Sequence, residues 1–336
     1  MRKGSRALNL ILVLAAAGLV LATMAALSAR LWWAFDLFSH FRPQYVVAAG
    51  TLCVVALAVR AYPIAAALAV VALVHGWAIK DLWLGGGASA APGGVPVRIV
   101  SANVLAVNPT PAAVPALVRA SDADLVMLVE ANRRRWGKAL SELAALYPYR
   151  APQALPEGGV PVVLFSRLPI VREEVVRAPR GQRPYLLAEL TVGGQPLMVV
   201  GVHPSSPSPG EPHRSRRRNH ELDHIAAIVR DADRPLIVAG DFNSTPWSPH
   251  FRDLIAAGGL RNAAGGQGYV PTWPRWFWPA LIPIDHVLLK GPLAVTTIRR
   301  GRAIGSDHYP IIADLRLLCG PERQARQTMR IDPGPP

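Results

Sequence analysis

Cysteine, lysine and acidic residues are scarce in this sequence. Two cysteines, Cys53 and Cys319, are too few for a disulfide framework or a thiolate zinc site. Only four of the 36 basic residues are lysine, so arginine carries most of the formal charge of +14. A basic chain suits a polyanionic substrate or an anionic membrane surface, although an arginine-rich composition alone gives the same excess.

Charged residues are nearly absent from the first 90 positions. Residues 7–29 carry no charge and are long enough to cross a bilayer about 30 Å thick. The basic start MRKGSR also suits a signal peptide, but the apolar stretch after it exceeds the usual length of one. Two further apolar runs cover about 45–59 and 62–79. We predict three transmembrane helices within residues 1–84, with two as the alternative because the later runs are short.

Tryptophans mark one end of the predicted spans. Trp32 and Trp33 follow the first run, and Trp77 and Trp83 close the third. Aromatic residues favour the membrane–water interface, so both ends are expected on one side of the membrane. A basic N-terminus favours a cytoplasmic start. We therefore predict a multi-pass protein of the cytoplasmic membrane, with the rest of the chain outside the cytoplasm and no obligate protein partner evident.

The remainder of the chain has the pattern of a mixed α/β domain. A glycine-rich linker covers 85–96, the domain covers 97–318, and a polar tail at 319–336 is predicted to be disordered. Strands are predicted at 97–102, 124–129, 160–166, 185–192, 196–203, 235–240, 284–290 and 310–318. Helices are predicted at about 111–121, 133–146, 213–231 and 248–257, with Pro115 disfavouring the first. Strands that come singly and in pairs favour mixed sheets covered by helices.

Polar residues follow these apolar strands at the points where each ends. They are Asn103, Glu130, His203, Asp241, Asn243, Asp285, Asp307 and His308. Strand ends are where α/β scaffolds place functional side chains. Each of these residues taken alone is equally suited to a structural hydrogen bond, so the prediction depends on the joint pattern.

The strings around these residues resemble the endonuclease/exonuclease/phosphatase (DNase I-like) superfamily. They are SANVL, LVMLVE, VGVH, AGDFNSTPWS, PIDHVLL and GSDHYPI, which occur in family order over about 97–317. The superfamily includes nucleases, inositol polyphosphate phosphatases and sphingomyelinases. The resemblance implies an α/β fold built as a two-sheet sandwich with helices outside, preceded here by the transmembrane region. The family often has glutamine before its metal-binding glutamate, where this chain has Val129.

The resemblance also implies a role for each residue. A phosphodiester gathers negative charge in its transition state, which a hard cation such as Mg²⁺ or Mn²⁺ stabilises. Glu130 is the expected metal ligand, with Asn103 and Asp307 as further candidates. By the resemblance, Asp285 orients His308, and His308 with Asp241 positions and deprotonates the attacking water. Asn243 and His203 are expected to donate to phosphate oxygens.

Two histidine-containing features have other interpretations. Residues 220–224 read HELDH and match the HExxH zinc peptidase signature. Helical phasing places Leu222 and Ile225 on the buried face and both histidines on the opposite one, which disfavours that reading. His286 follows Asp285 but faces away from it in a strand, so we interpret it as structural.

Two surface features bear on the substrate. Arginines at 214, 216, 217 and 218 begin a predicted helix, where they suit a phosphate-binding patch or a solvated surface. The aromatic segment TWPRWFWPALI at 272–282 suits an exposed loop or core packing. We predict a membrane-embedded, metal-dependent hydrolase of phosphate esters, whose substrate is nucleic acid or phospholipid. An inactive binding module of the same fold is the alternative.

Overall fold

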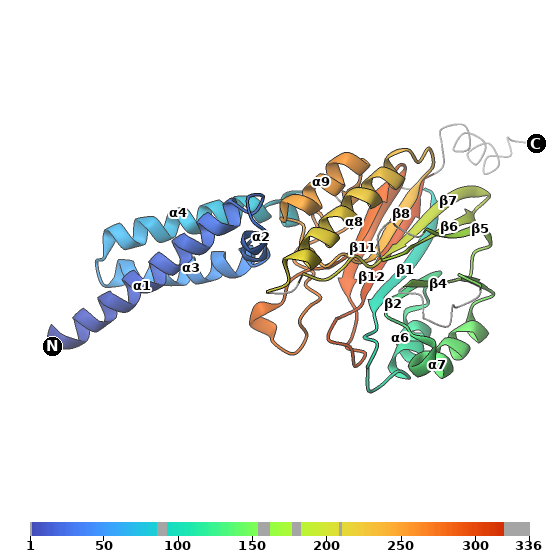
Figure 1. Cartoon of the computed structure of the whole chain (residues 1–336), viewed down its shortest axis with the longest axis horizontal. Helices are drawn as coiled ribbons and strands as arrows, with labels where there is room; N and C mark the ends of the chain where they lie inside the picture. The colour runs from blue at the N-terminus through green and yellow to red at the C-terminus, as the bar shows by residue number, and fades with distance from the viewer. Residues whose placement is uncertain (1, 86–92, 154–161, 177–182, 208–209, 319–336) are drawn as a thin grey trace, which may run out of the picture.

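The computed structural model places an N-terminal helical bundle against a two-sheet α/β sandwich (Figure 1). It describes residues 2–85, 93–153, 162–176, 183–207 and 210–318. Most of the predicted linker and the whole of the predicted tail lie outside the described residues. Strand β1 already begins at Val95, so the last two positions assigned to the linker belong to the sandwich.

The bundle consists of helices that expose apolar side chains. Its elements are α1 (Arg2–Leu27), α2 (Trp33–Ser39), α3 (Arg42–Ala58), α4 (Tyr62–Ile79) and the short α5 (Asp81–Leu84). Residues 7–27 and 62–84 are long and apolar enough to cross a membrane. The predicted span at 45–59 falls on α3, which reaches the necessary length only together with α2, across a bend of 62°. By length and composition the described bundle thus has two spans, or three if the bent pair is one.

Two six-stranded mixed sheets form the sandwich. The first has the order β11 (Leu293–Arg300), β12 (Ile311–Leu317), β1 (Val95–Asn103), β2 (Leu125–Val129), β4 (Val162–Ser166) and β3 (Tyr149–Ala151). The second has the order β5 (Ile170–Val176), β6 (Tyr185–Val192), β7 (Gln195–Val202), β8 (Leu236–Asp241), β10 (Asp285–Lys290) and β9 (Arg261–Asn262). Each sheet contains one parallel pair, β1 with β2 and β7 with β8.

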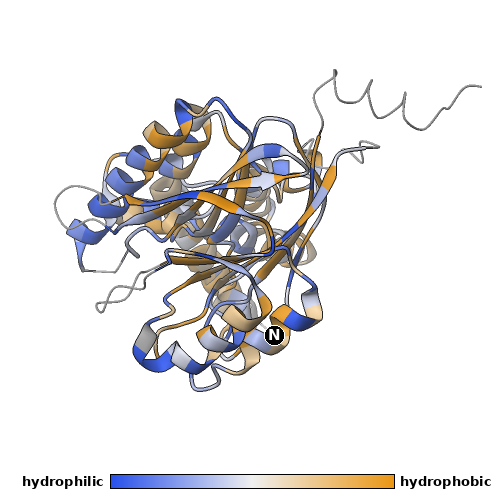
Figure 2. Ribbon diagram, turned by 90° about the vertical axis from the view of Figure 1, so that its right-hand side faces the viewer, coloured by the Kyte–Doolittle hydropathy of each residue, from blue (hydrophilic) through white to orange (hydrophobic). Residues whose placement is uncertain are grey.

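Helices cover the outer face of each sheet. The first sheet is covered by α6 (Ala113–Ser121) and α7 (Arg133–Leu146), and the second by α8 (Pro212–Arg230) and α9 (Pro249–Gly258). A third apolar cluster lies between the sheets, so each sheet is buried on both faces. Figure 2 shows the apolar residues on the strands and the hydrophilic ones on outward helix faces.

Several predicted elements are extended or corrected. The eight predicted strands and four predicted helices all occur, with ends shifted by a few residues. Pro115 lies in the first turn of α6, where its missing N–H breaks no helical hydrogen bond. The sequence pattern did not indicate α2, the short α5 or four strands, β3, β5, β9 and β11. In β5 and β11 charged or hydroxyl side chains occupy exposed positions, and the two remaining strands have three residues or fewer.

Candidate active site

Four of the predicted residues stand at the carboxyl ends of the two parallel strand pairs. Asn103 is the last residue of β1 and Glu130 follows β2, while His203 follows β7 and Asp241 ends β8. A parallel pair brings its carboxyl ends to one edge of the sheet, so each sheet supplies two polar side chains at neighbouring positions. All four line one cavity between the sheets.

The Asn103 side chain joins the two sheets. Its Nδ2 donates to Glu130 Oε1 and to Asp241 Oδ2, both at 3.0 Å, while its Oδ1 accepts from the Leu105 backbone N–H. Glu130 has a φ of 65° and accepts a second bond from the Ala106 N–H at 3.1 Å. A metal-binding Asn103 would turn its oxygen toward the carboxylates. In this conformation the nitrogen faces them, so Asn103 orients Glu130 and Asp241.

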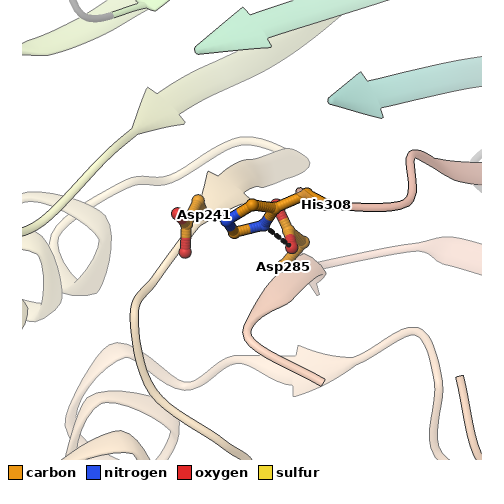
Figure 3. Close-up of side chains that lie close together, drawn as sticks. All are labelled: Asp241, Asp285 and His308. Atoms are coloured by element: carbon orange, nitrogen blue, oxygen red, sulfur yellow. Dashed lines mark hydrogen bonds and ion pairs between the residues drawn. The ribbon is translucent and has the colours of Figure 1, made fainter. Parts of the chain in front are cut away.

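Asp285 holds His308 against Asp241. Nδ1 of His308 lies 2.8 Å from Asp285 Oδ2, and Nε2 of the same ring lies 3.8 Å from Asp241 Oδ2 (Figure 3). Asp285 and Asp241 are direct neighbours in the register of β10 and β8, which brings the carboxylates together. All three side chains are buried. This is the contact expected of a residue that orients the His308 imidazole.

The carboxylates set the protonation of the histidine. Burial alone would lower the pKa of His308, but Asp285 and Asp241 outweigh it and raise that pKa to about 10. Burial and the neighbouring Asp285 raise the pKa of Asp241 to about 7. At neutral pH His308 is therefore an imidazolium, and the raised pKa of Asp241 allows this carboxylate to take up a proton.

His203 lies beside a cation that the sequence analysis missed. Nη1 of Arg183 lies 2.7 Å from both ring nitrogens of His203, whose Nε2 is 3.5 Å from Glu130 Oε1. Burial, followed by Arg183 and His308, lowers the pKa of His203 well below its usual value. His203 is thus neutral, and the guanidinium of Arg183 is the charged donor available to a phosphate. Arg183 precedes β6, and no local pattern marked it.

Asn243 is held in a left-handed turn behind Asp241. Its φ is 51°, its backbone N–H donates to Asp241 Oδ1 at 2.8 Å, and its Nδ2 donates to the Pro204 carbonyl at 3.0 Å. Its own carbonyl accepts from Arg218 Nη1 at 3.2 Å. Asn243 lines the cavity, and a side-chain amide has a second N–H, which is left for a ligand.

Asp307 is fixed by the aromatic segment. Its Oδ2 accepts from Trp273 Nε1 at 3.1 Å, and its carbonyl accepts from the Arg275 N–H at 2.8 Å. Its Oδ1 lies 3.4 Å from Ser306 Oγ, which also donates to the Asn103 carbonyl at 2.8 Å. Asp307 is half-buried and lines the same cavity as Glu130.

The cavity has a volume of about 410 Å³ and collects seven of the eight predicted residues. Asp285, the eighth, lies behind His308. Part of the wall comes from outside the sandwich, from Leu37, His40 and Phe41 at α2 and the start of α3. The sequence analysis missed this contribution because the segment has the composition of a membrane flank.

The donor set suits a hard divalent cation. Glu130, Asp241 and Asp307 line the cavity and supply carboxylate oxygens, the ligands that such cations prefer. Oδ1 of Asp285 is buried without a hydrogen-bond partner, which leaves an acceptor for a cation or a water to satisfy. The Glu130 side chain is 27% exposed and is reachable from solvent.

The glutamate of the HELDH segment makes structural hydrogen bonds. Its Glu221 is buried and accepts from the backbone N–H groups of Arg183, at 2.8 Å, and Ser205, at 2.5 Å. His220 is exposed on the other side of α8. Among the described residues, the side chains of Asp241, Asp285 and His308 lie close enough together to bind one metal ion, and neither histidine of HELDH belongs to this group. His286, interpreted as structural, is buried with Nε2 2.9 Å from the Ser244 carbonyl.

The predicted arginine patch is divided by the fold. Arg216 and Arg217 are exposed and Arg214 is half-buried. Arg218 is buried, and its Nη2 donates to Asp36 on α2 at 2.5 Å. Arg218 is therefore no part of a surface patch, because the carboxylate of Asp36 in the helical bundle neutralises it.

Comparison with known proteins agrees with this architecture. The model of the Endonuclease/Exonuclease/phosphatase family matches residues 100–308. A UPF0294 protein of Vibrio cholerae is 32% identical over 127 residues, which cover 37% of this chain and 42% of that protein. The match therefore spans less than half the length of the curated relative.

Three solved structures have a similar fold at low sequence identity. D. rerio TDP2 complexed with single strand DNA product has a TM-score of 0.53 and 17% identity over 66% of this chain and 99% of that chain. Beta toxin from Staphylococcus aureus with bound magnesium ions has a TM-score of 0.50 and 19% identity, and the match covers 65% of this chain and 98% of that chain. Sphingomyelinase C from Streptomyces griseocarneus has a TM-score of 0.50 and 21% identity, and the match covers 65% of this chain and 99% of that chain.

Proposed function

The chain belongs to the endonuclease/exonuclease/phosphatase family, and from that membership we propose that it hydrolyses phosphodiesters with Mg²⁺ or Mn²⁺. One observation carries the proposal, which is the convergence of Asn103, Glu130, Asp241 and His308 in one cavity between the sheets. These residues lie at the ends of separate strands, and packing of an apolar core does not require them to meet.

Glu130 is proposed as the principal metal ligand, with Asp307 and Asn103 as further candidates. A bound cation polarises the phosphoryl oxygen and stabilises charge on the leaving oxygen. Glu130 and Asp307 line the cavity with their carboxylates, which supports this assignment, as do the magnesium ions bound to beta toxin, a protein of the same fold. Asn103 would contribute its oxygen after rotation of the amide, and otherwise it holds Glu130 in place.

The remaining residues handle the water and the phosphate. Asp285 keeps the His308 imidazolium aimed at Asp241, and this pair positions the attacking water. Asp241 accepts the proton of that water as its oxygen bonds to phosphorus. The opposite P–O bond breaks, and its electron pair leaves on an alkoxide that takes a proton from solvent. The products are an alcohol and a phosphate monoester, with His203, Asn243 and Arg183 beside the phosphate oxygens.

The N-terminal bundle is proposed to anchor the enzyme in the cell membrane. α1, α3 and α4 would cross three times, with α2 at the membrane surface, placing residues 97–318 outside the cytoplasm. Basic residues at positions 2, 3 and 6 support a cytoplasmic N-terminus. No obligate protein partner is proposed. Nucleic acid and phospholipid are both candidate substrates, because proteins of this fold include a complex with single strand DNA product and a sphingomyelinase C.

The proposal is tested with the purified full-length protein in detergent, using bis(p-nitrophenyl) phosphate as a soluble phosphodiester. We expect turnover that a chelator abolishes and that Mg²⁺ or Mn²⁺ restores. Glu130→Gln should lower kcat/KM by about 100-fold or more, because it removes the charge that holds the cation. Glu142→Gln is the matched control, since this glutamate lies on α7 and pairs with Arg119.

The alternatives predict different results. An inactive binding module would bind Mn²⁺ through Glu130 yet turn over no phosphate ester. A zinc peptidase would cleave peptides, and His220→Ala would abolish that cleavage while Glu130→Gln would not affect it.

A further inference from the structure

We infer that this site takes its phosphodiester from a membrane phospholipid at the bilayer surface. The inference rests on the proposed hydrolase function and names its substrate class. Three features carry it: helix α2 is fixed to the catalytic domain, the segment 37–41 forms part of the cavity wall, and the loop that forms another part exposes an aromatic tip. Together they place the catalytic groups at the level where the bundle meets the sandwich.

Helix α2 is fixed by a buried polar network. Asp36 accepts from Arg218 Nη2 at 2.5 Å and from Ser248 Oγ at 2.9 Å, and both ends of the ion pair are almost completely buried. His40 Nδ1 lies 3.0 Å from Thr245 Oγ1. Thr245 and Ser248 lie in the loop that follows Asp241 and leads to α9. The segment 36–40 is thus attached to the loop that follows Asp241. This attachment holds the cavity in one orientation relative to the helical bundle.

The same segment forms an apolar part of the cavity wall. Leu37 and Phe41 line the cavity together with the polar residues, as do Ile282, the last residue of the aromatic segment, and Ile284. Phe41 immediately precedes α3. Gln44, in the first turn of α3, donates to the Leu281 carbonyl at 2.8 Å. The cavity is therefore bounded by residues within one turn of a candidate membrane helix, and a phosphate bound there would have apolar side chains beside it.

The aromatic segment forms a loop whose tip is exposed. Trp273 and Ile282 pair across its base and both line the cavity. At the tip, Trp276 is 72% exposed, Phe277 48% and Trp278 79%. None of these three lines the cavity. Exposed tryptophans in such a cluster suit the membrane–water interface.

The exposed tip lies at the bundle end of the sandwich. Figure 1 shows the loop that contains Trp278, in orange, beside the bundle. In the bundle, Trp32 lies between α1 and α2 and is 53% exposed, and Trp77 lies in the last turn of α4 and is 73% exposed. The loop and the bundle thus both expose tryptophans near the segment 37–41 and the junction with the sandwich.

A nucleic acid fits this arrangement less well. Single strands bind in a basic groove that follows many phosphates. Of the cavity-lining residues within the described part of the chain, Arg183 is the one arginine or lysine, and it suits a single phosphate. Exposed Arg216 and Arg217 lie on α8 and do not line the cavity. One phosphate donor beside an apolar wall matches a lipid headgroup joined to a glycerol or sphingoid backbone.

The experiment reconstitutes the full-length protein into two sets of liposomes. One contains phosphatidylethanolamine and phosphatidylglycerol, and the other contains phosphatidylcholine and sphingomyelin, which distinguishes the two lipid sources. Water adds across one P–O bond, so release of a phosphate monoester or an alcohol measures turnover. We expect release from at least one set, faster than cleavage of a single-stranded oligonucleotide at equal phosphate.

The loop variant separates lipid delivery from chemistry. We expect the double substitution Trp276→Ala and Trp278→Ala to lower turnover of liposome lipid by roughly tenfold, because two interfacial anchors are lost. Turnover of bis(p-nitrophenyl) phosphate should stay within about twofold, since neither residue lines the cavity. Tyr149→Ala, which removes an aromatic side chain 37% exposed on β3, is the matched control.

The outcomes distinguish this inference from the proposed function. The lipid assignment would be overturned if the protein cleaved the oligonucleotide faster than the lipids of both liposome sets. It would also be overturned if the loop variant lost turnover equally on liposome lipid and on the soluble diester. Either result would leave the proposed hydrolase function in place. Absence of turnover on the soluble diester would remove the hydrolase proposal, and the lipid inference with it.

Discussion

Asp36 and Arg218 form a buried ion pair that joins helix α2 of the bundle to helix α8 of the sandwich, with the two side chains 2% and 1% exposed. The partners are 182 positions apart in the chain. The pair also reaches the active site, because Arg218 donates to the carbonyl of Asn243. The link between bundle and sandwich is therefore part of the structure that supports the catalytic residues.

Asp36→Asn should destabilise the protein strongly. The substitution leaves the Arg218 charge buried and uncompensated, at a cost of about 3–5 kcal/mol. The measurement is thermal unfolding of the full chain in detergent. Asp253→Asn is the matched control, because it removes the exposed Arg30–Asp253 pair between the same two parts of the chain, with an expected cost below about 1 kcal/mol. Equal effects of the two substitutions would contradict the buried pair.

Asp285→Asn should disable catalysis without preventing substrate binding. The asparagine keeps the shape of the side chain but removes the charge that holds the His308 imidazolium. We expect kcat to fall by about 100-fold or more with little change in KM, and the pKa of His308 to fall. Steady-state kinetics and histidine NMR measure the two effects. Asp314→Asn, at the Arg98 pair on β12, should leave both unchanged.

Acid should destabilise the fold through His286. Burial lowers the pKa of His286 to about 4 from an ordinary value of 6.5. Above pH 6.5 the ring is neutral in both states, and as the pH falls toward 4 the unfolded chain binds a proton that the folded chain refuses. Stability is therefore lost in this window, by up to about 3 kcal/mol.

The matched variant isolates that contribution. His286→Gln cannot titrate, so its unfolding free energy should fall less than that of the parent chain between pH 6.5 and 4. The variant will be less stable at neutral pH if the Ser244 contact is lost. Parallel pH profiles of the two proteins would show that His286 is not the group that titrates.

Gly240→Ala should displace Asp241. Gly240 has a φ of 146°, and a Cβ at this position would lie 1.9 Å from the Val202 carbonyl oxygen of the neighbouring strand. We expect loss of activity and destabilisation of about 1–3 kcal/mol. Gly137→Ala is the control, because its Cβ meets nothing within 4 Å on α7 and should stabilise that helix by about 0.5–1 kcal/mol. Normal activity of Gly240→Ala would be inconsistent with this account.

The part of the site that sequence predicts is the part built on strand ends. Asn103, Glu130 and Asp241 each follow a short apolar run, and the two parallel pairs carry them to one cavity. The relation between Asp285 and His308 came from family resemblance, and the 2.8 Å contact is consistent with it. The metal assignment of Asn103 and Asp307 stays a prediction.

The part that sequence could not predict depends on contacts between distant segments. Arg183 has no local signal, and its role follows from a contact with His203. Leu37 and Phe41 lie in a stretch whose composition indicates only a membrane flank. Arg218 was grouped with exposed neighbours, because helical phasing does not reveal a carboxylate from another helix. Strands β5 and β11 were missed because exposed polar side chains interrupt their apolar pattern.

The 62° bend between α2 and α3 bears on how such an enzyme would meet its substrate. With α2 fixed to the sandwich and α3 in the bilayer as proposed, the candidate catalytic groups would keep one elevation above the lipid plane. Encounters then occur by lateral diffusion within a sheet of molecules. The rate would follow the mole fraction of the substrate in the leaflet, and dilution by inert lipid would slow it where dilution by buffer would not.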